Sequence, residues 1–151
     1  MSRQRYEDLV RDLCKVFEVG NADGVLQRGA LEVSGYEVSL LHLGNDEHAM
    51  YMNFNFGIAS AGKTLRLFYL MLQSNLSIYA QDQAQLGVSP DTGVVLLIVR
   101  VPMTDDIDGQ WLADTFVHYS EHGRYWRQNM ADVPDDQFPG APSAPFLWMR
   151  A

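Results

Sequence analysis

Residues 70–103 read LMLQSNLSIYAQDQAQLGVSPDTGVVLLIVRVPM and contain three regular elements in close succession. The first part continues an apolar helical pattern that begins at Lys63 and ends at about Tyr79. Two strand-like runs follow, Gln85–Val88 and Val94–Val101, on either side of the turn sequence SPDTG. Two strands joined by so short a connection are antiparallel. The stretch therefore predicts a helix followed by a β-hairpin.

The N-terminal half predicts a helix and a three-stranded meander. Apolar residues recur at steps of three and four over Arg3–Glu18, and short strand-like runs follow at Ala30–Val33, Tyr36–Leu43 and Met50–Phe56. Turn residues separate these runs, which makes the meander antiparallel. A last helix spans Ile107 to about Met130. The predicted order is α-β-β-β-α-β-β-α, an α+β fold with an antiparallel sheet flanked by helices.

Size and composition indicate one folded domain over residues 1–130. Residues 131–151 hold four of the six prolines and show little periodicity, so we expect a flexible, extended tail. No apolar run is long enough to span a bilayer, and the N-terminus lacks the apolar centre of a signal peptide, which predicts a cytoplasmic protein. The net charge of −8 disfavours nucleic acid and anionic membranes as partners.

One short motif suggests nucleotide binding. Gly57, Gly62, Lys63 and Thr64 fit the pattern G-x-x-x-x-G-K-[ST] of a phosphate-binding loop. Such a loop belongs in a parallel sheet, however, whereas the strand before this one ends an antiparallel meander. The apolar strand VVLLIVRV also lacks the terminal acid that would hold magnesium. We interpret the match as a coincidental helix start.

A second motif suggests zinc. His118 and His122 fit the pattern H-x-x-E-H on the last helix, but no glutamate follows Glu121 as a third ligand. We therefore expect two solvated histidines and no metal. The sequence also lacks a G-x-S-x-G nucleophile elbow, and its single cysteine, Cys14, lies among apolar residues. No catalytic constellation or cofactor site is predicted, so we expect a protein that is not an enzyme.

The helix that begins at Lys63 carries apolar residues around nearly its whole circumference. One face of a sheet cannot cover such a helix, so a second covering surface is required. We expect this second surface to be a homodimer interface and assign to it Leu67, Leu70 and Met71 on the helix, with Ile98 on the last strand.

The same region resembles the class I type III secretion chaperones, the Tir-chaperone family. Those proteins show a leucine-rich helix that ends near an asparagine, then an L-G-x-x-x-x-T-G turn and an apolar strand. The matching residues here are Leu70, Leu72, Asn75, Leu76, Leu86, Gly87, Thr92, Gly93 and Leu96. The last helix is similar to the closing helix of the family at Phe116, Val117, Trp126 and Arg127. The resemblance covers residues 3 to about 130.

This resemblance implies a homodimer that binds the N-terminal segment of a secreted effector and keeps it competent for export, without a cofactor or chemistry. In the family, client grooves involve the first helix and the nearby sheet. The corresponding apolar candidates here are Val10, Leu13 and Phe17, with Leu41 and Leu43 on the second strand. Two alternatives stay open at this point, a nucleotide-binding protein using Gly57–Thr64 and an α+β adaptor for another protein partner.

Overall fold

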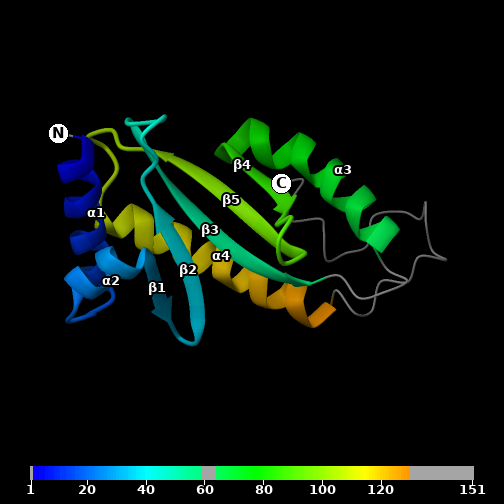
Figure 1. The fold of residues 1–151 in the computed structure, drawn as a ribbon, viewed down its shortest axis with the longest axis horizontal. Coiled ribbons are helices and arrows are strands. Elements are labelled where there is room, and N and C mark those ends of the chain that lie inside the picture. Colours follow the sequence, from blue (N-terminus) through cyan, green and yellow to red (C-terminus); the bar gives the residue numbers. More distant parts are fainter. Residues whose placement is uncertain (1, 59–63, 130–151) are drawn as a thin grey trace. The chain divides into compact units, whose positions relative to one another are not determined.

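The computed structural model of the protein describes residues 2–58 and 64–129, apart from the side chains of residues 80–82 (Figure 1). Its elements are α1 (Ser2–Val16), α2 (Ala22–Arg28), β1 (Ala30–Val33), β2 (Tyr36–Leu41), β3 (Ala49–Ile58), α3 (Thr64–Asp82), β4 (Ala84–Val88), β5 (Val94–Pro102) and α4 (Gly109–Asn129). The strands form one five-stranded sheet in the order β1-β2-β3-β5-β4, and the pairs β1–β2, β2–β3 and β4–β5 are antiparallel. The predicted α+β fold, with its antiparallel meander, is confirmed. The tail from residue 131 lies outside the described residues.

The short helix α2 is additional to the predicted elements. Asn21 caps its start, because the Asn21 side chain accepts a hydrogen bond from the Gly24 backbone N–H at 3.0 Å. Gly29 closes its end in the left-handed conformation, with φ of 65°. The helix has seven residues and buries only Val25. So little apolar surface leaves no periodic pattern from which a helix could be predicted.

The described chain divides into two compact units, residues 2–54 with 100–120 and residues 55–58 with 64–99 and 121–129. In the first unit, the strands alternate between an inner face and an outer face. The inner face, represented by Val38, Leu40, Met52 and Phe54, is fully buried. The Phe54 ring lies 6.2 Å from that of Phe116 and 5.5 Å from that of Tyr119, both on α4. Helix α4 therefore covers the inner face in this unit.

Helix α1 is held to the same unit by both polar and close backbone contacts. The Tyr6 hydroxyl donates to the Leu40 carbonyl at 2.8 Å, and the Arg5 guanidinium donates to the carbonyls of Thr104 and Ile107 at 2.9 and 2.7 Å. The start of α4 approaches α1 so closely that a Cβ built on Gly109 would lie 2.6 Å from a backbone carbon of Asp12. Only glycine fits at this crossing without a shift of one helix.

We predict that Gly109→Ala destabilises the protein by about 1–3 kcal/mol, because the added methyl group has to displace the Asp12 backbone. Chemical unfolding followed by circular dichroism measures this. Gly44→Ala is the matched control, since a Cβ at Gly44 meets no atom within 4 Å. Equal stability of the two variants would contradict the predicted clash.

The loop between β2 and β3 is fixed to β5 by one carboxylate in the first unit. Asp46 accepts hydrogen bonds from Arg100 Nε at 2.7 Å, from Arg100 Nη2 at 2.9 Å and from the Tyr51 hydroxyl at 2.6 Å. The bonds from Arg100, followed by the bond from Tyr51, lower the pKa of Asp46 from 3.8 to about 2. The ionised carboxylate is therefore the form that the fold stabilises.

This pKa shift predicts how the free energy of unfolding varies with pH. Because the folded-state pKa of Asp46 lies below its unfolded value, the contribution is complete above about pH 4 to 5 and is lost as the pH falls toward about 2. In urea titrations from pH 6 to 2, the stability difference between wild type and Asp46→Asn should shrink across that window. Asp91→Asn, at an exposed turn residue, serves as control. A difference that stayed constant down to pH 2 would refute this role of Asp46.

In the second unit, α3 lies beside the edge strand β4 (Figure 1). The β4–β5 hairpin buries one face, represented by Leu86, Val95, Leu97 and Val99. The end of β3 is covered by the last turns of α4, where the ring of Phe56 lies 5.3 Å from that of Trp126. Among the helices in the described part of the chain, none is long and apolar enough to cross a membrane.

Candidate protein-binding surfaces

Helix α3 carries two apolar stripes on opposite sides. At about 100° per residue, Leu67, Leu70, Met71 and Ile78 fall on one side, and these side chains are buried. The opposite side is exposed and we call it the α3 outer stripe. It consists of Leu65, Phe68, Tyr69, Leu72, Leu76 and Tyr79. The exposed fractions of Leu65, Leu72 and Leu76 are 62%, 69% and 82%. Six large apolar side chains at helical spacing form a contiguous patch typical of a protein-binding surface.

The structure places the residues that the sequence assigned to a dimer interface on the inward side of this helix. Leu67, Leu70 and Met71 are 4%, 2% and 5% exposed, so they contact the chain's own core, and Ile98 on β5 is half-buried. The expectation that this helix has more apolar surface than its own core covers agrees with the burial pattern. The spacing 65, 68/69, 72, 76 and 79 was present in the sequence and could have identified the outer stripe.

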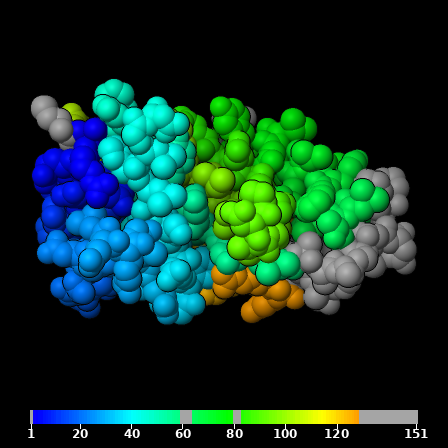
Figure 2. Space-filling model, viewed as in Figure 1, coloured from blue at the N-terminus to red at the C-terminus, as the bar shows by residue number. Residues whose placement is uncertain are grey.

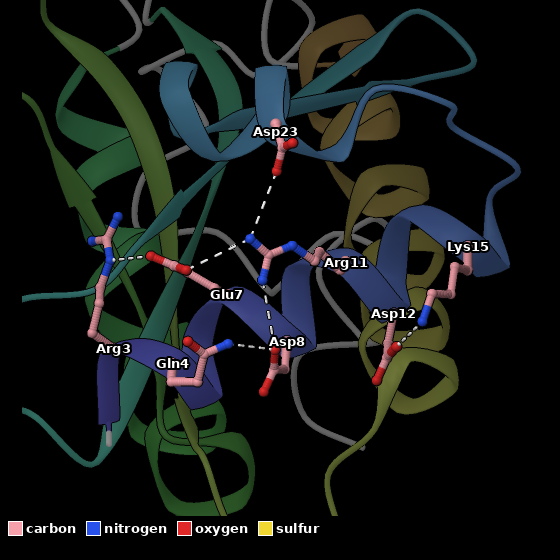
Figure 3. Close-up of polar contacts among 8 residues, drawn as sticks. All are labelled: Arg3, Gln4, Glu7, Asp8, Arg11, Asp12, Lys15 and Asp23. Atoms are coloured by element: carbon pink, nitrogen blue, oxygen red, sulfur yellow. Dashed lines mark hydrogen bonds and ion pairs between the residues drawn. The ribbon is translucent and has the colours of Figure 1, made fainter.

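The solvent side of α1 in the first unit is charged rather than apolar (Figure 3). Glu7 lies between Arg3 at 3.0 Å and Arg11 at 3.7 Å, and Arg11 also reaches Asp23 on α2 at 3.6 Å. Each of these exposed pairs contributes little stability by itself, but together they keep the outward side of the helix hydrated. An apolar segment gains nothing by binding along this side of α1.

The five residues predicted to contact a client separate into three groups by exposure. Val10 and Leu13 are fully buried in the core of the first unit, so neither offers a surface. Phe17 is half-buried, with its ring 5.2 Å from that of Phe116. Leu41 and Leu43, by contrast, are 36% and 41% exposed. The apolar residues that recur along α1 lie on the side of the helix that faces the core, so they are buried. On β2 the buried positions alternate and end at Leu40, so Leu41 falls on the other face and Leu43 lies beyond the end of the strand.

Leu41 belongs to the outer face of the meander. Cross-strand register places Ser39 opposite Asn53 and Leu41 opposite Tyr51 on this face. The first half of α4 lies behind β2 and β3 in Figure 1, and Figure 2 shows the same strands uncovered from the front. Exposed Leu41 and Leu43 therefore lie on accessible surface at one end of β2.

The structure describes part of the surroundings of the two motifs that suggested nucleotide and zinc binding. Strand β3 pairs antiparallel with β2, which is not the setting of a phosphate-binding loop. Residues 59–63 of that motif, including Gly62 and Lys63, lie outside the described residues. Within residues 2–58 and 64–129, no three His, Cys, Asp or Glu side chains lie together as a metal site requires. The absence of nucleotide and zinc binding stays a prediction.

We predict no magnesium-dependent binding of ATP or GTP, and Lys63→Ala should leave both stability and partner binding unchanged. The physical reason is the antiparallel sheet around β3, which does not direct a loop of backbone N–H groups at a phosphate. Isothermal titration with Mg-ATP and Mg-GTP tests this. Micromolar affinity that disappears in Lys63→Ala would identify the motif as a working site.

The contiguous exposed stripe on α3 is the feature of this α+β fold that is typical of a protein-binding surface. The profile of the Tir chaperone protein (CesT) family matches residues 23–127, and the chain belongs to this family. The predicted resemblance is thereby confirmed. Comparison with curated proteins gives no significant match in sequence.

Solved structures share the fold at low sequence identity. One is described as the HopA1–SchA chaperone–effector complex, with 15% identity, a TM-score of 0.63, and coverage of 85% of this chain and 97% of the other. Another is described as the ExsC–ExsE complex, with 15% identity, a TM-score of 0.57, and coverage of 82% and 96%. At these identities the likeness concerns the fold.

Proposed function

We propose that this protein is a bacterial cytoplasmic chaperone that binds the N-terminal segment of a type III secreted effector and keeps it export-competent, acting as a homodimer and without catalysis. The observation that carries the proposal is the family match over residues 23–127. The description of one structural neighbour as a chaperone–effector complex supports it. The exposed apolar side chains supply the surface that such a task needs.

The experiment that tests this function is affinity purification of the tagged protein from its source bacterium with active type III secretion. The expected result is a co-purified secreted protein whose binding maps to its N-terminal segment and whose export falls when the chaperone gene is deleted. Recovery only of proteins that are not exported would favour the alternative of an adaptor for another partner.

The client surface of the proposal lies in the first unit at Leu41 and Leu43; Phe17 packs against Phe116 of the helix that covers the inner face and is not part of it. An extended client can place apolar side chains against these two leucines and can also pair its backbone with the open edge of β1. The acidic charge of the protein keeps such a complex soluble. Val10 and Leu13 are not part of the proposed surface, because they are fully buried.

We predict that Leu41→Asp combined with Leu43→Asp weakens client capture at least about tenfold while the protein stays folded, because each charge removes an apolar contact and must be desolvated. Pull-down of the co-purified effector segment measures this. Val88→Asp, at a comparably exposed residue of the other unit, is the control. Val10→Asp should instead unfold the chain. Undiminished capture by the double variant would place the client elsewhere.

The homodimer of the proposal uses the α3 outer stripe. Apolar side chains that a single chain leaves exposed are covered when two copies pack stripe against stripe, since a two-fold interface uses the same patch twice. Obligate interfaces have the apolar composition of a domain core, which fits leucine at the two most exposed stripe positions, Leu76 and Leu72.

We predict that Leu72→Asp or Leu76→Asp converts the dimer to a folded monomer, because an unpaired charge in a desolvated apolar interface is strongly unfavourable. Leu70→Asp, at 2% exposure, should lower the free energy of unfolding instead. Sedimentation velocity and chemical unfolding separate the two effects, with Val16→Asp as an exposed control on α1. A stable wild-type monomer at micromolar concentration would contradict the dimer.

A further inference from the structure

The two ends of the sheet order are β1 and β4, and a side chain occupies the free edge of β4. Asn75 on α3 accepts a hydrogen bond from the Leu86 backbone N–H through Oδ1 at 2.6 Å. Its Nδ2 donates to the carbonyl of the same residue at 3.1 Å. One side-chain amide thus satisfies both backbone groups of a strand residue, as a neighbouring strand would.

The hairpin register shows which backbone groups of β4 point to the edge. The Ser89 N–H donates to the Val94 carbonyl at 2.9 Å, so Ser89 and Val94 form a hydrogen-bonded pair. Such pairs alternate along an antiparallel ladder. In the register that pairs Val88 with Val95 and Leu86 with Leu97, the N–H and C=O groups of Ala84, Leu86 and Val88 therefore point away from β5. Asn75 occupies the central one of these three positions.

Strand β1 forms the other end of the sheet order. The Leu40 N–H donates to the Gly29 carbonyl at 2.8 Å, and the alternation from that pair directs the backbone groups of Ala30 and Glu32 away from β2. An uncovered strand edge is a template for another extended chain.

We infer that Asn75 is an edge cap that closes β4 against strand addition. The inference concerns the protein alone and is independent of the proposed function. An incoming strand at β4 has to break both bonds of Asn75 before it can pair with Leu86. Asn75 is one of the positions in the helix-to-hairpin stretch of the sequence, and this geometry gives it a physical role.

The test of the cap uses Asn75→Ala and Asn75→Leu in the full chain without a client. Amide hydrogen exchange by NMR should show the Leu86 N–H exchanging about tenfold faster in both variants, the loss expected for one hydrogen bond. The N–H groups of Gln85 and Gly87 point toward β5 and should keep their wild-type rates. If their exchange rose equally, Asn75 would merely support the fold and the inference would be overturned.

Without the cap, the edge of β4 should pair with strand edges of other molecules. Both variants should form species larger than wild type in sedimentation velocity, and a second substitution, Val88→Pro, should reverse this because proline removes an outward N–H from the edge. Gln73→Ala on the same helix is the control and should stay like wild type. Because Asn75→Leu retains side-chain volume, it decides the outcome if Asn75→Ala fails to fold. A folded Asn75→Leu variant with the wild-type association state would overturn the cap.

Discussion

Burial of the inner face of the meander is the constraint on which the first unit depends. Phe54 on β3 contacts two aromatic rings of α4, and Tyr6 of α1 is hydrogen-bonded to the backbone of β2. Because strand side chains alternate, covering this face leaves the opposite one accessible. The exposed position of Leu41 follows from this alternation. The accessible face on which we propose the client surface is thus a consequence of how the core is built.

In the second unit, the packing depends on helix α3. Helix α3 has to cover the β4–β5 hairpin, and one side of the helix is enough for that. The remaining apolar side is exposed in the single chain. Such a stripe costs solubility unless a partner covers it, so its presence is best explained by association. The polar residue between these two sides, Asn75, is used for the backbone of β4 instead.

The row of charged side chains and the exposed leucines lie on different elements of this protein. The outward side of α1 carries a row of interlocked acidic and basic residues, whereas exposed leucines lie on α3 and at the end of β2. A chaperone that holds an unfolded segment needs apolar binding patches on a surface that is otherwise charged. The net charge of −8 and the localised stripes are consistent with that requirement.

The sequence by itself determined the α+β class, the antiparallel meander and the family, because these depend on local periodicity, on short turns and on the spacing of residues 70–103. It did not reveal α2, whose single buried residue leaves no pattern. The sequence also could not assign sides. Val10, Leu13 and Leu70 have the same apolar character as Leu41, Leu72 and Leu76, yet the first three are buried and the last three exposed. Which side of an apolar element faces inward depends on contacts between residues far apart in the chain, such as those of Gly109 with Asp12 and of Asn75 with Leu86, and these only the tertiary structure decided.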